Sequence, residues 1–328
     1  MGKIISVPPA FAAGARISTG QYKLDYQCSL QDPEKFWGDA GKRLDWLKPY
    51  TQVKATSFDR NDFHIRWYAD GELNVAANCL DRHLAVRGAK CAILWEPDEP
   101  GEPAQRISYR ELHARVCRLA NALGNLGVAK GDRVTIYLPM IPEAAVAMLA
   151  CARIGAVHSV VFGGFSPDSI AGRVADCGSK FIITADEGRR GGKRVPLKAN
   201  VDEALKRPGT HSVETVLVVR HTGAAVPMQM PRDRWYDAVV DSQDSTHAPV
   251  AMTAEDPLFI LYTSGSTGKP KGVLHSGGGY LVWASLTHEA VFDLREDDVF
   301  WCTADVGWVT GSRFCFRVVV QSCRGQLS

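Results

Sequence analysis

The segment Tyr262–Ser276, "YTSGSTGKPKGVLHS", combines glycines, hydroxyl side chains and two lysines directly behind the apolar run "LFIL". Glycine lets backbone N–H groups approach a ligand closely, while the hydroxyls and lysines add further donors and positive charge. This combination suits a polyphosphate. A polar surface loop is the simpler alternative, but such loops rarely place hydroxyls and lysines behind a strand without an acidic residue among them.

The segment does not have the Walker A pattern, G-x-x-x-x-G-K-[ST]. Gly268 and Lys269 are followed by Pro270, and no glycine stands five residues before Gly268. The proline also prevents a phosphate-capping helix from beginning there. A Walker-type kinase or ATPase is therefore disfavoured.

Strands and helices alternate from Ser108 onward, and they would position this loop. Ser108 and Glu111 have the spacing of a capping box, which predicts a helix ending near Gly127. Pro142 and Gly155 mark the start and stop of another helix. Strands are predicted at "VTIYL", "AVHSVVF", "FIIT", "VETVLVVR" and "PLFILY". The alternation predicts an α/β fold with parallel sheets flanked by helices.

Three segments upstream carry weaker patterns. "GDAGKRLDWLKPY" and "NVAANCLDRHL" predict two short helices, and "EPDEPGEPAQR" predicts a surface loop or hairpin connection.

The pattern at Thr263–Gly272, together with "PMIPEAAVAMLACARIGAVHSVVFGGFSP" and "FWCTADVGWVTG", resembles the AMP-forming acetyl-CoA synthetase family of adenylate-forming enzymes. The resemblance extends from about Gln21 to Gly311. It implies part of the large N-terminal domain of such an enzyme. It also implies a two-step reaction, in which acetate and ATP give acetyl-AMP and pyrophosphate, and coenzyme A then takes the acetyl group and releases AMP.

The resemblance implies a role for each motif. Thr263 and Lys271 are expected to act in catalysis. The residues expected to cradle the ATP phosphates are Thr263, Ser264, Gly265, Ser266, Thr267, Gly268 and Lys269. The residues expected to bind coenzyme A are Arg190, Gly191, Gly192, Lys193, Gly163, Gly164 and Thr310, and the acetate pocket is expected at Val309 and Thr310.

Each of these motifs also has a simpler interpretation. From composition alone, "DEGRRGGKR" reads as a solvated charge cluster, and Lys193 stands where the family has an arginine, which loses bidentate geometry. "FGGFSP" reads as a plain turn, and "TADVGWVTG" as a strand end packed into the core. The lone histidines, His158, His275 and His288, are expected to be packing or surface residues.

Composition limits the class of protein. The 328 residues carry a formal net charge of +2, so there is no overall electrostatic case for nucleic acid or an anionic membrane. We expect small-molecule substrates (acetate, ATP with Mg²⁺, coenzyme A), no metal site and no tightly bound prosthetic group. The nine cysteines form no C-x-x-C pair, which favours a reducing compartment, and the N-terminus lacks a secretory pattern. A cytoplasmic location is therefore expected.

The sequence departs from the family pattern after Gly311. We predict a family-specific N-terminal region at residues 1–105, the α/β part of the AMP-binding domain at 106–311, and an aberrant tail at 312–328 produced by a frameshift, a retained intron or an alternative exon. The family's small C-terminal domain would be absent, so the chain alone is expected to be inactive and poorly soluble. Two alternatives remain: a ligase for propionate or another short acid, and a non-catalytic product that binds nucleotide or coenzyme A, or pairs with the full-length enzyme.

Overall fold

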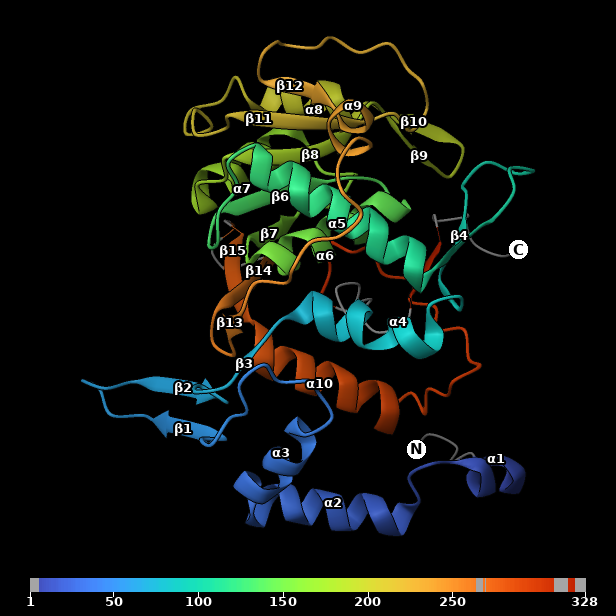
Figure 1. The fold of residues 1–328 in the computed structure, drawn as a ribbon, viewed down its shortest axis with the longest axis vertical. Helices are drawn as coiled ribbons and strands as arrows, with labels where there is room; N and C mark the ends of the chain where they lie inside the picture. Colours follow the sequence, from blue (N-terminus) through green and yellow to red (C-terminus); the bar gives the residue numbers. More distant parts are fainter. Residues whose placement is uncertain (1–5, 264–267, 269, 310–317, 322–328) are drawn as a thin grey trace.

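The computed structural model describes residues 6–263, 268, 270–309 and 318–321 (Figure 1). Its main feature is a seven-stranded sheet with the strand order β12-β11-β8-β6-β7-β14-β15. The strands are β6 (Arg133–Tyr137), β7 (Val157–Val160), β8 (Phe181–Ala185), β11 (Thr215–Val219), β12 (Asp233–Trp235), β14 (Pro257–Thr263) and β15 (Lys271–Ser276). Each neighbouring pair from β12 to β14 is parallel, which confirms the predicted α/β sheet.

Strand β15 differs from the expectation because it runs antiparallel to β14. Residues 264–270 connect the two strands, whereas a parallel crossover needs about a dozen residues or more. So short a connection permits only an antiparallel return. The sheet is therefore mixed, with one antiparallel strand at its edge.

Helices cover both faces of this sheet. They are α5 (Tyr109–Asn125), α6 (Pro142–Ile154), α7 (Pro167–Cys177), α8 (Leu197–Ala204) and α9 (Tyr236–Val240). Strand β7 lies on one side of β6, and the next strands along the chain, β8 and β11, lie on the other side. Because such crossovers are right-handed, α6 lies on one face and α7 and α8 lie on the other. The packing agrees, since α5 contacts α6 and α9 while α7 contacts α8.

The predicted helix boundaries are confirmed at the caps. The Ser108 hydroxyl accepts the Glu111 N–H at 3.2 Å, and the Glu111 carboxylate accepts the Ser108 N–H at 3.2 Å. Pro142 begins α6, and Gly155 ends it with a left-handed φ of 76°. These ends depend on interactions between residues three or four apart, which explains why the sequence predicts them well.

The first hundred residues form smaller units around the sheet. They contain α1 (Pro9–Gly14), α2 (Thr19–Gln31), α3 (Pro33–Gly41), the hairpin β1 (Lys54–Ser57) and β2 (His64–Trp67), β3 (Glu72–Leu73), the π-helical turn η1 (Ala77–Asp81) and α4 (Arg82–Arg87). Helix α10 (Gly277–Ala290) packs against α3 at the bottom of Figure 1. Strand β3 pairs with β13 (Met252–Thr253) and joins this region to the chain before β14.

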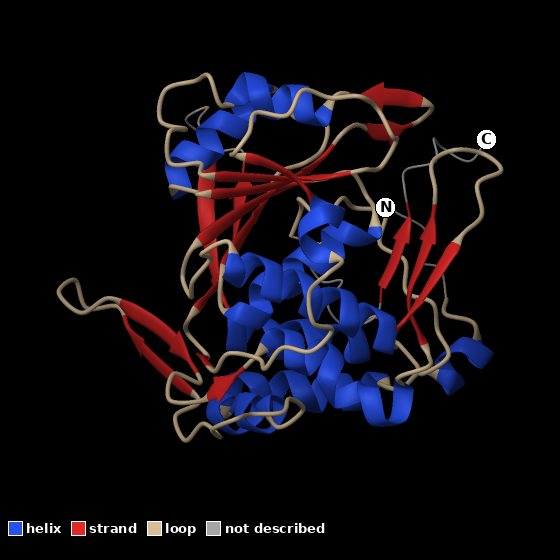
Figure 2. Cartoon of the chain, turned by 45° about the horizontal axis from the view of Figure 1, so that its top comes forward, coloured by secondary structure: helices blue, strands red, loops and turns tan. Residues whose placement is uncertain are grey.

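A separate three-stranded sheet has the order β16-β4-β5 (Figure 2). It contains β4 (Cys91–Glu96), β5 (Gln105–Ser108) and β16 (Val318–Gln321). Strands β4 and β5 are antiparallel, so "EPDEPGEPAQR" contains a hairpin connection, as predicted. The remaining short strands, β9 (Gly188–Arg190) and β10 (Lys193–Val195), form a hairpin of their own.

Of the two upstream helix predictions, "NVAANCLDRHL" is confirmed by η1 and α4. The prediction for residues 38–50 is wrong beyond Gly41, where α3 ends. Backbone donors after that point bond to distant partners: the Asp45 N–H to the Asn78 side chain at 2.8 Å, and the Leu47 N–H to the Glu72 carbonyl at 2.7 Å. Tertiary hydrogen bonds replace the helical ones, because either arrangement satisfies the same groups.

Among the described residues, no helix is both long and apolar enough to cross a membrane. Large apolar side chains are exposed on α2 and α10, including Tyr22, Leu24, Leu30 and Trp283. Exposed apolar surface of this kind favours association. The low solubility expected from the sequence remains a prediction.

Candidate functional site

The carboxyl ends of the parallel strands bring together most of the motifs singled out in the sequence. Pro139 and Met140 follow β6, the glycine pair Gly163–Gly164 follows β7, the β9–β10 hairpin follows β8, and the glycine-rich segment follows β14. In open α/β sheets, ligands bind in the crevice outside the carboxyl ends of the strands. We therefore expect a binding site at this edge.

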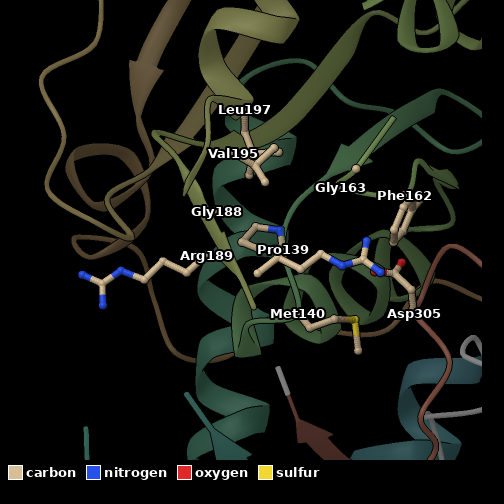
Figure 3. Close-up of a pocket in the computed structure, with 11 residues that line it drawn as sticks. Pro139, Met140, Phe162, Gly163, Gly188, Arg189, Val195, Leu197 and Asp305 are labelled. Carbon is tan, nitrogen blue, oxygen red and sulfur yellow. The ribbon is translucent and has the colours of Figure 1, made fainter. Parts of the chain in front are cut away.

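A cavity lies at this edge, with about 410 Å³ of empty space including its open mouth. Figure 3 shows the side chains that surround it. The lining residues are Pro139, Met140, Phe162, Gly163, Gly164, Gly188, Arg189, Arg190, Val195, Leu197 and Asp305. The structure thus brings three of the predicted coenzyme A residues, Gly163, Gly164 and Arg190, into one cavity wall.

Gly163 and Gly164 lie so close to neighbouring atoms that a side chain would not fit without displacing them. A Cβ on Gly164 would lie 2.6 Å from the Phe162 ring and 3.2 Å from an Arg190 nitrogen, and one on Gly163 would lie 3.2 Å from the Leu138 carbonyl oxygen. Any side chain at residue 164 would displace Phe162 or Arg190. The pair is therefore more than a plain turn, because it leaves room for the two groups that form the wall.

The four cations of the β9–β10 hairpin lie on its two opposite faces. Arg190 pairs with Lys193 across the strands, and Arg189 pairs with Arg194. Cross-strand partners share a face and consecutive residues alternate, so Arg190 and Lys193 lie on one face and the other two lie on the opposite face. Figure 3 shows Arg189 directed away from Phe162 and Asp305. Arg189 is among the lining residues, but its guanidinium forms ion pairs with Glu99 at 2.8 Å and Glu102 at 3.0 Å, and these two carboxylates do not line the cavity.

Arg190 is the cation of the cavity. Its guanidinium carbon lies 4.5 Å from the centre of the Phe162 ring, a cation–π contact that leaves the N–H donors at the edge of the group available. Within the described part of the chain, no carboxylate oxygen lies within 4.0 Å of its nitrogens. Lys193 shares its face but does not line the cavity, and Gly191 and Gly192 form the turn beyond it.

Asp305 is the acidic group of the cavity; it lies within the segment "TADVGWVTG", but no role for it was predicted from the sequence. Burial raises the pKa of its carboxyl to about 6, against the opposing effects of the Gly307 N–H and the Arg190 charge. The Gly307 N–H donates to Asp305 at 2.8 Å. An ionised Asp305 repels an anion bound at Arg190, whereas protonation near pH 6 removes that repulsion.

We therefore expect Asp305→Asn to bind adenosine 3′,5′-bisphosphate more tightly than the wild type at pH 7.5, by about threefold to tenfold for one nearby charge. The ratio of the wild-type to the variant dissociation constant should fall towards one below pH 6, because the wild-type carboxyl is then neutral. The ligand phosphates titrate in the same way in the experiments with both proteins, so their titration does not change this ratio. Calorimetry between pH 5.5 and 7.5 measures it, and a ratio that does not change with pH would contradict the assignment.

The predicted phosphate loop is described only in part, at residues 263, 268 and 270–272. Thr263 ends β14 and Lys271 begins β15, and the two residues are direct partners in the antiparallel register. Gly268 has a left-handed φ of 81°, which suits glycine. The Tyr262 hydroxyl donates to Asp176 at 2.7 Å and ties the base of the loop to α7. Ser264, Gly265, Ser266, Thr267 and Lys269 lie outside the described residues, so their cradle remains a prediction.

Val309 lies in a different cavity. That cavity is lined mainly by aromatic residues and joins the N-terminal region to β15 and α10; its walls include Trp37, Trp67, Tyr68, His275, Tyr280, Trp283 and Val309. Trp37 stands 5.7 Å from the ring centres of both Trp67 and Trp283. The structure thus does not place Val309 in the cavity of Arg190, and Thr310 lies outside the described residues. The acetate pocket remains a prediction.

The packing role expected for the lone histidines is confirmed. His158 and His275 stack on Phe259, with ring centres 5.5 Å and 4.5 Å apart. Burial lowers the pKa of His158 to about 3, so this imidazole is neutral. His288 is buried, and its Nδ1 lies 2.8 Å from the Ala284 carbonyl oxygen.

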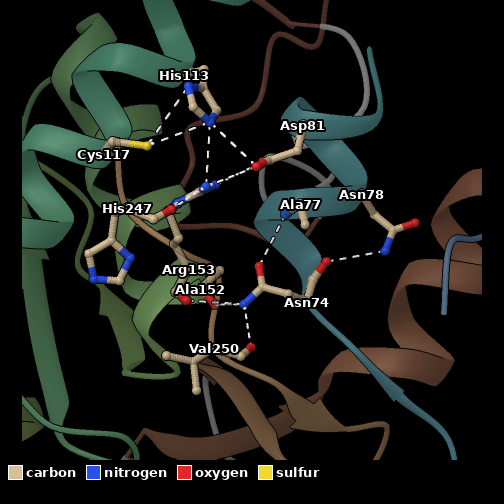
Figure 4. A network of polar contacts seen from close by, with 10 residues as sticks. All are labelled: Asn74, Ala77, Asn78, Asp81, His113, Cys117, Ala152, Arg153, His247 and Val250. Atoms are coloured by element: carbon tan, nitrogen blue, oxygen red, sulfur yellow. Dashed lines mark hydrogen bonds and ion pairs between the residues drawn. The ribbon is translucent and has the colours of Figure 1, made fainter. Parts of the chain in front are cut away.

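A second polar cluster, away from the cavity, joins the N-terminal region to the sheet domain (Figure 4). Arg153 on α6 donates to both carboxylate oxygens of Asp81, at 2.8 and 2.9 Å. His113 on α5 lies 3.4 Å from the same carboxylate, and the hydrogen bond to Asp81 raises the pKa of His113 to about 9. The Asn74 amide donates to the carbonyls of Ala152, Arg153 and Val250. These groups connect four segments of the chain and have a structural role.

Comparison with known proteins shows the family to which the chain belongs. A family model described as AMP-binding enzyme matches residues 80–324, and a model described as acetyl-coenzyme A synthetase N-terminus matches residues 22–79. The chain belongs to the AMP-binding enzyme family.

Similar proteins narrow the resemblance to a particular enzyme. The acetyl-coenzyme A synthetase of Xanthomonas campestris pv. campestris is 68% identical over 314 residues, which are 96% of this chain and 48% of that protein. The protein of the same name from Xylella fastidiosa is 63% identical over 314 residues, and that from Novosphingobium aromaticivorans is 60% identical over 316. The resemblance drawn from the motifs is confirmed. The chain spans about half the length of the curated relatives it matches.

Proposed function

We propose that this chain carries the ATP phosphate loop and the coenzyme A nucleotide site of an AMP-forming acetate–CoA ligase. The observation that carries the proposal is the cavity at the carboxyl edge of the sheet, where Arg190 stacks on Phe162 beside the glycine pair. A stacked guanidinium that has no carboxylate oxygen within 4.0 Å in the described part of the chain is suited to a phosphorylated nucleotide. The names of the similar proteins supply the reaction.

In that reaction an acetate oxygen attacks the α-phosphorus of Mg–ATP, and the bond to the leaving pyrophosphate breaks. The thiol of coenzyme A then attacks the acyl carbon, loses its proton, and displaces AMP. The loop amides, Thr263 and Lys271 would stabilise the charge that develops on the phosphates. Among the described residues, no three His, Cys, Asp or Glu side chains form a metal site. We propose that Mg²⁺ enters with ATP as part of the substrate.

The proposed partners are small molecules: acetate, ATP and coenzyme A. Two arginines line the cavity, and one of them, Arg189, is paired with Glu99 and Glu102, so we propose no nucleic-acid role. The nine cysteines form no C-x-x-C pair, which supports a reducing compartment, and we propose a cytoplasmic location.

The test measures binding and turnover on the same preparation. We expect the chain to bind coenzyme A saturably, and acetate-dependent pyrophosphate release reports whether it also activates an acid. Release that is faster with propionate than with acetate would favour the alternative short-acid ligase. Saturable binding without release from any acid would favour the non-catalytic alternative, and an absence of coenzyme A binding would contradict the proposed site.

A further inference from the structure

The tip of the β9–β10 hairpin is held by a carboxylate that no sequence motif marked. Gly191 and Gly192 have φ values of 56° and 74°, so they form a two-residue turn with both residues left-handed. The N–H groups of these two residues point out of the hairpin ladder and need a partner elsewhere. Each donates to one oxygen of Asp98, both at 3.1 Å, and Asp98 is only 9% exposed.

We propose that Asp98 is a positioning residue that orients this hairpin so that Arg190 enters the cavity. The inference rests on the proposed function, because it concerns the same cavity. Asp98 lies in the connection between β4 and β5, 93 residues from Gly191 in the sequence. Asp98 bonds to the turn and is not among the residues that line the cavity, so its effect on a ligand is exerted through Arg190.

Three further contacts connect β4 and the β4–β5 connection to the walls of the cavity. Glu99 and Glu102 bind Arg189 on the outer face of the hairpin. At the end of β4, the Trp95 indole N–H donates to the Met140 carbonyl at 2.8 Å, and Met140 lines the cavity. The same segment therefore holds the hairpin on one side of the cavity and the loop after β6 on the other.

Removing the charge of Asp98 is expected to change the affinity for a phosphate ligand in two opposite directions, one through electrostatics and one through positioning. A carboxylate near a cationic site repels an anion, so by charge alone Asp98→Asn would tighten binding of a phosphate. Asparagine, however, offers one acceptor and opposes the second turn N–H with its own amide donor. The turn then loses a charge-assisted hydrogen bond, and Arg190 loses its fixed direction. The charge of Asp98 is already stabilised by two N–H groups, so its repulsion of an anion is small. The loss of positioning is therefore the larger effect, and we expect Asp98→Asn to weaken binding.

The experiment uses the full 328-residue chain and calorimetry with adenosine 3′,5′-bisphosphate. We expect Asp98→Asn to weaken binding about tenfold, the effect of one lost hydrogen bond to a charged group. Asp98→Glu restores part of the affinity because it keeps both oxygens. The matched control is Glu214→Gln, which removes the same charge from an exposed carboxylate just before β11, at the opposite edge of the sheet.

Amide hydrogen exchange at Gly191 and Gly192 is measured on the same variants. Faster exchange in Asp98→Asn, with an unchanged thermal midpoint, separates loss of positioning from global unfolding. Unchanged or tighter binding together with protected turn amides would overturn the inference. If the wild type does not bind the probe, or Arg190→Ala binds it equally well, the proposed function fails instead. Hydrogen exchange then decides the role of Asp98 alone: lost protection supports it and retained protection overturns it.

Discussion

Replacing Arg153 by methionine is expected to lower the free energy of unfolding by about 3 kcal/mol, the lower end of the range for breaking a buried ion pair. Arg153 is 2% exposed and makes a bidentate pair with Asp81. It also donates to the His247 carbonyl at 2.8 and 2.6 Å. Methionine keeps the volume but leaves the carboxylate and the carbonyl without this donor. The loss stays at the lower end because the Asp81 side chain is 30% exposed and keeps His113 nearby.

Urea unfolding followed by tryptophan fluorescence measures this change. Arg115→Met is the control, because Arg115 lies on α5, is 35% exposed and forms a long ion pair of 3.9 Å with Glu111. A surface pair of this kind contributes under about 1 kcal/mol. The double variant Asp81→Asn/Arg153→Met should cost less than the sum of the two single variants, since it leaves no buried charge unpaired. Equal losses for Arg153→Met and Arg115→Met would refute the structural role of the cluster.

Replacing Arg190 by alanine is expected to weaken coenzyme A binding about 10- to 100-fold, the range for hydrogen bonds to a charged group. Arg190 is the cation that the hairpin directs into the cavity, and its position over Phe162 pre-orients the guanidinium for a phosphate. Arg190→Lys should have an intermediate effect, because it keeps the charge but loses the planar fork and the stacking.

Calorimetry with coenzyme A measures the loss, and Arg194→Ala is the matched control. Arg194 belongs to the same hairpin, but it lies on the opposite face and is paired with Glu187 at 3.0 Å. Arg194→Ala removes the same charge as Arg190→Ala, so long-range electrostatics affects both variants alike. If the two variants weaken binding equally, the hairpin attracts the ligand only through its overall charge and the specific role of Arg190 is wrong.

Local patterns in the sequence determined much of the sheet domain. The capping box at Ser108 and Glu111, the Pro142 start and the Gly155 stop depend on groups within a few residues of one another, so each could be predicted without the rest of the chain. The alternation of apolar strands and helices likewise determined the parallel sheet. The segment at Thr263–Gly272, placed after a buried strand, indicated the class of enzyme.

Only the tertiary structure decided which residues face the cavity. "GRRGGKR" contains four cations, and the register of the hairpin selects Arg190 for the cavity and turns Arg189 towards Glu99 and Glu102. Asp98 and Asp305 come from distant parts of the chain, and no local pattern links them to that hairpin. The physical reason is the same in each case. Strand register, burial and contacts between residues far apart in sequence arise only when the chain folds, whereas caps, turns and periodicity are already present in short segments.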